Sequence, residues 1–555
     1  MHERSLISIR NSALWAAHGD ALGFISELVD RKGLIRRIDA DRVTRTVPWR
    51  RRVGGRFGIE IMLPAGCYSD DTQLRLSTSR AIRGDGEFDV EAFAKVELPI
   101  WLSYALGAGK GTRSAAMSLS HQNANWFSNF FNDEHISYVN CGGNGAAMRI
   151  QPHVWSARDR SRPETFIVDV IKNSVCTHGH PRGILGAVFH ALCLAMTLDR
   201  GYVAGPGEWA EAIAFFPKVA DLMRSDDSLC LFWLPTWEKK TGGSIEVALA
   251  QVQDECFDDL IGVRNYTSGK GTENDYAQLV EALGAKRGDQ RGSGTKTAFI
   301  ASVLSWLYKD KHPAMALQAA SNLLNSDTDT IGTMAGALLG CVADQAPVED
   351  IQDCVYIKAE ACRLYKISQS HPTQSFNYPD LVGWQPPTTQ LDAVGIVDGH
   401  LAVAGLGMAV ARGEEYKSQA KESTIWQWLE LEFGESILVK HRKNPRPLPL
   451  NNLPLESRSP KVIATQPTGQ KVRQQLSFPE HNIDFTKGTK GMNMHEKTIH
   501  ELTNEVIESG FDEVLIGRHL LSLTAHPDGV ERAIAYVSII AKARIARLTS
   551  RNHKR

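Results

Sequence analysis

Apolar and small residues recur at helical spacing along most of the chain up to residue 367. From Leu6 to Val29 they fall on one side at Leu6, Ile9, Ala13, Ala17, Ala21 and Ile25, which predicts an N-terminal helix. The same criterion predicts helices over 70–82, 90–105, 113–119, 166–175, 183–198, 295–307, 313–324 and 348–367. Strands do not alternate with these helices, so we expect an all-α domain packed as a bundle.

The pattern changes after this helical region. Residues 393–397 and 401–404 flank Asp398-Gly399, a pair that favours the primed turn of a β-hairpin. Prolines and basic residues then recur, which predicts an extended linker. Helical periodicity returns near the C-terminus. We therefore divide the chain into a helical domain (1–375), an accessory segment with a hairpin (376–436), a basic Pro-rich linker (437–491) and a small helical module (492–555).

Glycines recur every four residues in two predicted helices. Gly19 and Gly23 lie in the first helix, and Gly332, Gly336 and Gly340 follow an acidic cluster near residue 330. Glycine destabilises a helix interior, so we expect another backbone or a ligand to approach Gly19 and Gly23 closely. The second series predicts a helix packed deep in the bundle.

Composition excludes some classes of protein and favours others. The 62 Lys and Arg residues balance 63 Asp and Glu residues, so no overall charge favours nucleic acid or an anionic membrane. Nine scattered cysteines without zinc or disulfide spacing fit a reduced, cytoplasmic protein. The N-terminus lacks a signal-peptide pattern, and no uninterrupted run of 18 apolar residues occurs, so we expect no membrane partner.

Two acidic clusters carry the strongest chemical signal: Tyr68-Ser69-Asp70-Asp71-Thr72-Gln73 and Ser326-Asp327-Thr328-Asp329-Thr330-Ile331-Gly332. Within a helix Asp327 and Asp329 would diverge by about 200°, so they converge only in a loop or a first turn. Gathered carboxylates repel one another unless a hard cation neutralises them, which predicts a magnesium site built from both clusters. For each cluster alone, the alternative that Ser69 and Ser326 are N-caps stays equally open.

Three further features stand between these clusters or before them. Asp20 and Glu27 lie seven residues apart, which places both carboxylates on one face of the predicted helix, roughly 10 Å apart along its axis. They could bind a ligand together or be salt-bridged surface acids. The Gly-rich turn 141–149 offers backbone amides to a phosphate, or is simply a turn. In Thr177-His178-Gly179-His180 we favour hydrogen bonding to a ligand over metal binding.

Together these motifs resemble the ADP-ribosylglycohydrolase family. The resemblance rests on Gly19-Asp20-Ala21-Leu22-Gly23 with Glu27, Ser69-Asp70-Asp71-Thr72, Gly143-Asn144-Gly145-Ala146-Ala147-Met148-Arg149, Thr177-His178 and Asp327-Thr328-Asp329-Thr330-Ile331-Gly332, in family order over residues 6–367. It implies an all-α orthogonal helical bundle that holds two Mg²⁺ ions, with Mn²⁺ as an alternative, and cleaves the bond between ADP-ribose and its attachment.

The resemblance also implies roles for individual residues. The metal ligands are Ser69, Asp70, Asp71, Asp327, Asp329 and Thr330; the catalytic residues are Glu27, Asp71 and Asp329; and the substrate-binding residues are Asp20, Gly143, Asn144, Gly145, Met148 and His178. Ser69 stands where relatives often have Thr, which keeps a hydroxyl. Gly142 replaces a residue that is aromatic in some relatives, so adenine must stack elsewhere, with Phe131 and Tyr138 as candidates.

Three functions remain as hypotheses. The favoured one is a Mg²⁺-dependent hydrolase that removes ADP-ribose from a modified acceptor by cleaving the glycosidic bond at the distal ribose. The others are a catalytically weak ADP-ribose-binding or recruitment protein and another two-metal hydrolase of phosphoesters or nucleotides. The expected partner is an ADP-ribosylated substrate, with a macromolecular target contacted by the C-terminal extension. The acceptor stays open among arginine, serine, a nucleobase and a small molecule.

Overall fold

The computed structural model describes residues 2–55, 58–121, 124–134, 136–286, 288, 290–381, 383–417, 423–454, 497–525 and 529–552. The chain forms two compact units. The larger comprises Met1–Asp226 and Trp233–Arg458, and the smaller comprises Asp227–Phe232 and Ser459–Arg555.

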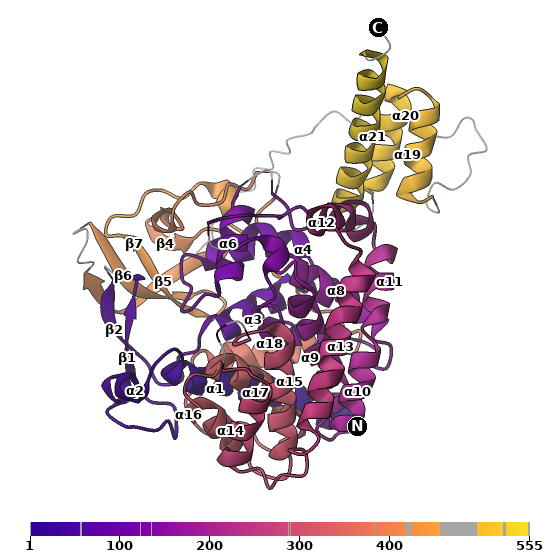
Figure 1. Ribbon diagram of the computed structural model, residues 1–555. Coiled ribbons are helices and arrows are strands. Elements are labelled where there is room, and N and C mark those ends of the chain that lie inside the picture. The colour runs from indigo at the N-terminus through magenta and orange to yellow at the C-terminus, as the bar shows by residue number, and fades with distance from the viewer. Residues whose placement is uncertain are drawn as a thin grey trace. The chain divides into compact units, whose positions relative to one another are not determined.

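The larger unit is mostly helical, as predicted (Figure 1). The helices of its first half are α1 (His2–Ser26), α2 (Arg31–Ile38), α3 (Asp70–Ala81), α4 (Val90–Ala92), α5 (Leu98–Trp101), α6 (Lys110–Leu119), α7 (Gln151–Trp155), α8 (Glu164–Val175) and α9 (Pro181–Arg200). Those of its second half are α10 (Pro206–Ala214), α11 (Pro217–Ser225), α12 (Leu234–Thr241), α13 (Ile245–Val263), α14 (Glu273–Ala282), α15 (Gly294–Leu307), α16 (Pro313–Asn322), α17 (Thr328–Val342) and α18 (Cys354–Ser368). Short helical turns of this unit are η2 (Phe93–Glu97), η3 (Tyr138–Asn140), η4 (Ala147–Arg149), η6 (Gln390–Asp392) and η7 (Leu450–Asn452). The turn η5 (Leu229–Trp233) falls mostly in the smaller unit.

Every predicted helix of this unit is present, with shifted ends. The N-terminal helix ends at Ser26 and not at Val29, so Glu27 lies just beyond it and does not share a helical face with Asp20. Leu28 has a positive φ of 56°, which turns the chain away from the helix axis. Helix α2 falls in a stretch where we expected only loop or short strands, and its charged, Gly-containing sequence gives little helical pattern.

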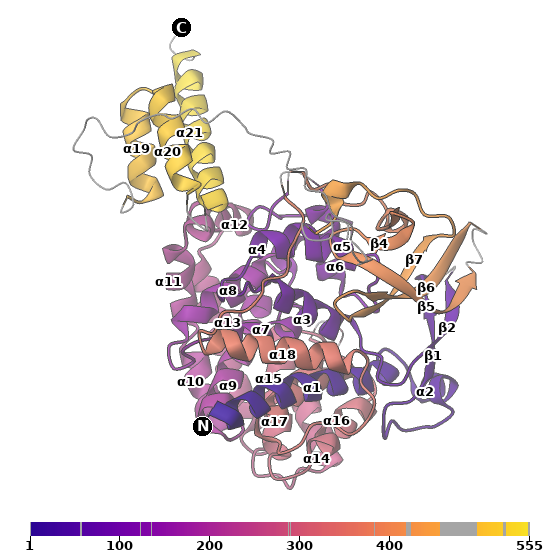
Figure 2. The same ribbon diagram turned by 180° about the vertical axis from the view of Figure 1, so that it is seen from behind.

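Glycine packing joins α1 to α17 at the centre of the bundle, and α18 runs beside α1 (Figure 2). A methyl group at Gly332 would lie 2.5 Å from the carbonyl oxygen of Gly19, and one at Gly23 would lie 2.3 Å from that of Thr328. The two backbones therefore touch where side chains would otherwise separate them. This confirms both glycine predictions and brings the start of α17 against α1.

Helix α9 is the one helix among the described residues that is long and apolar enough to cross a membrane by length and composition. Within its most apolar window, 83% of the residues are buried inside the structure. Such burial is typical of the core helix of a bundle, and α9 packs on α15 and α8.

The larger unit also contains two sheets. Strands β1 (Trp49–Val53) and β2 (Ile59–Leu63) form one antiparallel hairpin. Strands β3 (Val394–Val397), β4 (His400–Val403), β5 (Gly407–Lys417), β6 (Thr424–Leu431) and β7 (Ser436–Arg442) form an antiparallel five-stranded meander. The predicted hairpin is its first pair, and Asp398 and Gly399 have positive φ values of 48° and 82°, as a primed turn requires.

The predicted linker begins too early in the sequence. Residues 436–442 are strand β7, and the following segment returns to β3, where Ile396 donates its N–H to Arg446 and accepts one from Leu448. Leu453 is buried, so the chain belongs to the sheet to about residue 454. Prolines concealed this because each removes a backbone donor, although the edge of a sheet tolerates them. The remaining part of the predicted linker, 455–491, lies outside the described residues.

A buried charge network fastens the sheet to α3. The guanidinium of Arg80 on α3 binds Glu97 through two hydrogen bonds of 2.8 and 2.9 Å and also pairs with Glu435 in the turn between β6 and β7. All three side chains are buried to 1% exposure or less. A second link runs from Tyr68 through the carboxylate of Asp353 to the backbone N–H of Ser436. The sheet is thus an integral part of the unit that carries the first acidic cluster.

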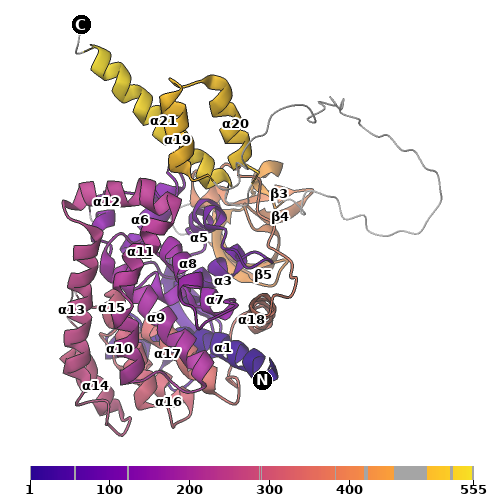
Figure 3. The same ribbon diagram turned by 90° about the vertical axis from the view of Figure 1, so that its right-hand side faces the viewer.

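The smaller unit contains the predicted C-terminal helices, α19 (Ile499–Glu508), α20 (Glu513–Leu523) and α21 (Gly529–Asn552), shown in Figure 3. Thr498 and Glu501 form a reciprocal capping box at the start of α19. In the interior of this smaller unit, Nδ1 of His519 and the hydroxyl of Tyr536 are hydrogen-bonded at 2.9 Å.

Candidate active site

The first acidic cluster forms the start of α3. Ser69 is its N-cap, and its hydroxyl accepts the N–H of Asp71 at 3.2 Å, so the capping prediction holds for this serine. Asp70 and Asp71 occupy the first turn and are buried. Burial, together with Glu27 and Asp20 nearby, raises the pKa of Asp70 to about 8.

Asp20 on α1 binds the backbone of this first acidic cluster. Its carboxylate is completely buried, and its two oxygens accept the N–H groups of Ser69 at 2.9 Å and Thr72 at 2.8 Å. Helix α1 thereby fixes the position of the first turn of α3. We expected Asp20 to bind substrate, which stays a prediction; in the structure each of its oxygens accepts one backbone N–H, so it also supports the start of α3.

The second cluster forms the start of α17. Asp327 is at the N-cap position but makes no capping hydrogen bond, and its Oδ2 accepts the side-chain amide of Asn144 at 2.7 Å. The hydroxyl of Ser326 donates to the carbonyl of Leu323. The alternative that Ser326 caps this helix is therefore wrong. Asp329 follows in the first turn and is buried, as is Thr330.

The two clusters meet although 259 positions separate them in sequence. The hydroxyl of Thr330 lies 3.3 Å from Oδ1 of Asp71 and donates to it. Burial raises the pKa of Asp71 and of Asp329 well above the usual range. Charge repulsion adds to this, from Asp20, Asp70 and Asp327 on Asp71 and from Glu27, Asp71 and Asp327 on Asp329. The structure thus brings the two clusters together through Thr330 and Asp71, and the charges of Asp70, Asp71, Asp327 and Asp329 act on one another.

This donor set suits a hard cation, which takes carboxylate and hydroxyl oxygens. Oδ2 of Asp71 is buried without a hydrogen-bond partner, as a ligand oxygen would be before an ion binds. Among the described residues no group of three or more His, Cys, Asp or Glu side chains is arranged to hold a metal ion. The predicted ligand set also includes two hydroxyl groups, those of Ser69 and Thr330, in addition to its aspartates.

The Gly-rich turn lies directly beside the second cluster. Asn144 reaches Asp327, and its backbone N–H donates to the carbonyl of Gly292 at 2.9 Å. His178 packs on the turn, since a methyl group at Gly145 would lie 3.4 Å from its Nε2 and one at Gly143 would lie 3.7 Å away. The structure therefore brings four of the predicted substrate-binding residues together: Gly143, Asn144, Gly145 and His178.

Of the remaining predicted residues around this turn, Met148 and Tyr138 lie in the interior and His180 is partly buried. Met148 is 2% exposed and follows the turn in η4. His180 accepts the N–H of Arg182 and is the N-cap of α9. Tyr138 is buried, and its hydroxyl binds the carbonyl of Val175, which leaves it in the core as a poor candidate for stacking on adenine.

Sequence reasoning missed the arginines around Glu27. Arg51 of β1 lies 3.6 Å from the Glu27 carboxylate, and both side chains are about four-fifths buried, at 17% and 18% exposure. Arg37 donates to the carbonyls of Ile25 and Glu27 and so caps the end of α1. Burial raises the pKa of Glu27, which Arg51 opposes. The alternation of β1, with Trp49, Arg51 and Val53 turned inward, could have indicated Arg51.

Comparison with known proteins agrees with this geometry. The family model described as ADP-ribosylglycohydrolase matches residues 5–352, which include both acidic clusters, the Gly-rich turn and His178. The chain belongs to the ADP-ribosylglycohydrolase family. This family consists of glycohydrolases, so membership supports a hydrolase. The five-stranded sheet begins after the matched residues and is an addition to the part that the ADP-ribosylglycohydrolase model covers.

Two individual proteins resemble this chain. The uncharacterized protein YegU of Escherichia coli (strain K12) is 27% identical over 202 residues, which are 36% of this chain and 49% of YegU. The matched region thus spans about half the length of that relative. A solved chain of an ADP-ribosylglycohydrolase-related protein complex is 18% identical, with a TM-score of 0.41, covering 66% of this chain and 99% of that one.

Proposed function

We propose that the protein is a magnesium-dependent hydrolase that removes ADP-ribose from a modified acceptor by cleaving the glycosidic bond at the distal ribose. The observation that carries this proposal is the hydrogen bond between Thr330 and Asp71, which joins two acidic clusters beside the Gly-rich turn. A merely structural pair of helix caps has no need of four converging carboxylates, because their repulsion destabilises the fold.

The residues that would hold two magnesium ions are Ser69, Asp70 and Asp71 of the first cluster and Asp327, Asp329 and Thr330 of the second. When bound, such ions neutralise the carboxylates and activate water for attack on the anomeric carbon. Asp71 is the best placed to take the proton of that water, because its Oδ2 has no hydrogen-bond partner. Asp329, fixed by the N–H of Thr330 at 2.9 Å, would orient the same water.

Glu27 would act at the scissile end. Cleavage of a glycosidic bond passes through an oxocarbenium-like state that a nearby carboxylate stabilises. Glu27 follows the end of α1 and lies against Arg51, which favours its charged form.

The Gly-rich turn and His178 would hold the ADP-ribose. Burial lowers the pKa of His178 to about 3, so its imidazole is neutral and binds through hydrogen bonds and not through charge. Its Nδ1 pairs with the Thr177 hydroxyl at 2.7 Å, which leaves Nε2 toward Gly143 and Gly145. A methyl group at Gly145 would lie 2.6 Å from the Thr112 hydroxyl oxygen and 3.0 Å from the His178 ring, so glycine allows these side chains to approach the backbone of the turn.

Product analysis separates this function from its two rivals. Purified protein is incubated with an ADP-ribosylated substrate and with nucleotides, in Mg²⁺ and in EDTA, and the products are resolved by chromatography and mass spectrometry. We expect free ADP-ribose with Mg²⁺ and none with EDTA. Release of inorganic phosphate or of AMP would instead support a phosphoester hydrolase. Binding of ADP-ribose without release in either condition would support a recruitment protein.

A further inference from the structure

The outward face of strands β5–β7 combines aromatic and basic side chains. Residues directly opposite each other in an antiparallel ladder project to the same side. Three rows therefore share this face: Arg412, Trp428 and Leu438; Tyr416, Trp426 and Lys440; and Thr424 with Arg442. Thr424, Trp426 and Leu438 on this face are buried, as are the alternate residues on the other side, among them Leu429, Ile437 and Val439. Trp428, Tyr416, Lys440 and Arg442 are mostly but not fully buried, and Arg412 is exposed, so parts of two rings and of three basic side chains reach the surface.

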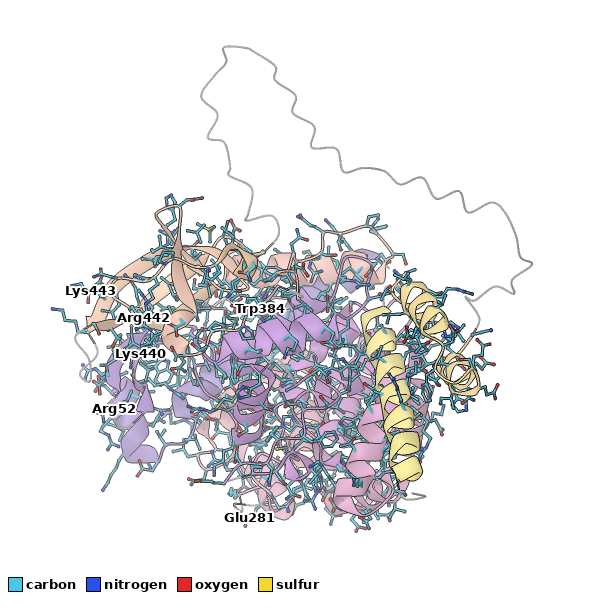
Figure 4. The ribbon with its side chains drawn as sticks, turned by 90° about the horizontal axis from the view of Figure 1, so that it is seen from above. Arg52, Glu281, Trp384, Lys440, Arg442 and Lys443 are labelled. Atoms are coloured by element: carbon cyan, nitrogen blue, oxygen red, sulfur yellow. The ribbon has the colours of Figure 1, made fainter. Side chains whose placement is uncertain are left out.

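The β1–β2 hairpin connects this face to the candidate active site. A methyl group at Gly54, in the hairpin turn, would lie 2.9 Å from the ring of Trp426. Arg50 and Arg52 of β1 are exposed, while Arg51 between them turns toward Glu27. Figure 4 shows Arg52 together with Lys440, Arg442 and Lys443 on one side of the larger unit. Basic residues thus extend from the scissile end of the site along the hairpin to the sheet.

The acids of this region only partly offset the basic residues. Glu430 pairs with Arg412 at 2.6 Å and Asp392 pairs with Arg442 at 2.8 Å, while Glu60 lies opposite Arg52 in the hairpin. Glu414 and Glu415 lie where the register of β5 is irregular. Within the described part of the chain, Arg50, Lys440 and Lys443 form no ion pair. Their charge is available to an anionic partner.

The chemistry of this face indicates the class of partner. Partly exposed aromatic rings beside arginine and lysine are the means by which proteins bind single-stranded nucleic acid, because bases stack on the rings and phosphates meet the cations. An acidic peptide would use the cations but not the rings.

We propose that the acceptor is a single-stranded nucleic acid whose modified nucleotide lies at Glu27 and whose neighbouring nucleotides cross the β1–β2 hairpin to the outward face of β5–β7. This inference rests on the proposed function and names its substrate class. The ADP-ribose part occupies the Gly-rich turn, and the polymer leaves the site along Arg50 and Arg52.

Two measurements on the full chain test the inference. The first is fluorescence anisotropy with unmodified 20-nucleotide single strands of DNA and RNA and with the DNA duplex. The test variants are Trp428→Ala, Lys440→Glu and both together. The matched charge control is Lys286→Glu. Lys286 pairs with Glu281, which lies away from the labelled basic residues in Figure 4. We expect salt-sensitive binding of a single strand, weakened about 5- to 150-fold by Trp428→Ala and unchanged by Lys286→Glu. Equal binding by all variants, or tighter binding of the duplex, would overturn the proposal.

The second measurement compares hydrolysis of ADP-ribose attached to a single-stranded oligonucleotide and to short arginine and serine peptides. We expect the oligonucleotide to be preferred, and the double variant to raise only its KM while leaving the peptide rates unchanged. Faster release from either peptide would refute the acceptor class while leaving the hydrolase intact. If no substrate releases ADP-ribose, the proposed function itself fails. Lys440→Glu alone, at a partly exposed position, serves as the test if the tryptophan variant does not fold.

Discussion

Arg80 offers a quantitative test of how the sheet is joined to the helical bundle. The change is Arg80→Met, which keeps much of the side-chain volume but removes the charge. Glu97 and Glu435 would then remain buried, at 0% exposure, without their cation. Breaking a buried ion pair by removing one partner destabilises a protein by about 3–5 kcal/mol. We expect a loss of that size, since two carboxylates depend on Arg80.

Urea denaturation followed by tryptophan fluorescence measures this loss. The control is Arg224→Met, which removes an exposed ion pair with Glu246, at 48% and 45% exposure, and should cost less than about 1 kcal/mol. Adding Glu435→Gln to Arg80→Met should restore part of the stability, because one buried negative charge is then gone. If Arg80→Met costs no more than Arg224→Met, the buried network does not hold the sheet and our reasoning is wrong.

Two further predictions concern the α1–α17 contact and the acidic site. Gly332→Ala should destabilise the protein by about 1–3 kcal/mol, because the added methyl group meets the Gly19 carbonyl. Gly207→Ala is the control and should not destabilise it, because a methyl group at Gly207 would meet open space. Thermal unfolding of both variants measures the difference. The pKa of Asp70 is about 8 in the folded state, above its unfolded value of about 3.9. The folded state therefore binds the proton more tightly than the unfolded state. The cation-free protein should thus lose stability as pH rises between these two values. Scanning calorimetry in EDTA should thus show a higher Tm near pH 5.5 than near pH 8, and Mg²⁺ should raise Tm mainly near pH 8; a Tm indifferent to both would count against the site.

Much of the fold follows from local sequence pattern. Helical periodicity located the core helices, and Asp398-Gly399 located a turn, because both signals depend on neighbouring residues. The convergence of Asp71 with Asp329 was predictable from chemistry, since spaced aspartates with hydroxyls need a common neutralising ion.

The rest depended on contacts between distant parts of the chain. Nothing near Asp20 in sequence shows that its oxygens bind the N–H groups of Ser69 and Thr72. Arg51 reaches Glu27 only because the β1–β2 hairpin folds over the end of α1. Strand β7 was assigned to the linker because Lys440, Arg442 and the prolines that follow from Pro445 signal exposure, while its pairing with β6 comes from the fold. Long-range partners of polar side chains are therefore what local patterns miss.

The most direct test of the account is the release of ADP-ribose by Asp71→Asn and Asp329→Asn variants in Mg²⁺. Asparagine keeps the shape of the side chain and removes the charge, and circular dichroism would confirm an intact fold. Asp310→Asn, which pairs with Lys309 at the surface, serves as the control. We predict that both site variants release ADP-ribose at least about 100-fold more slowly than the wild type, while the control is unchanged. Wild-type rates in either site variant would contradict the assignment of the two acidic clusters as the catalytic centre.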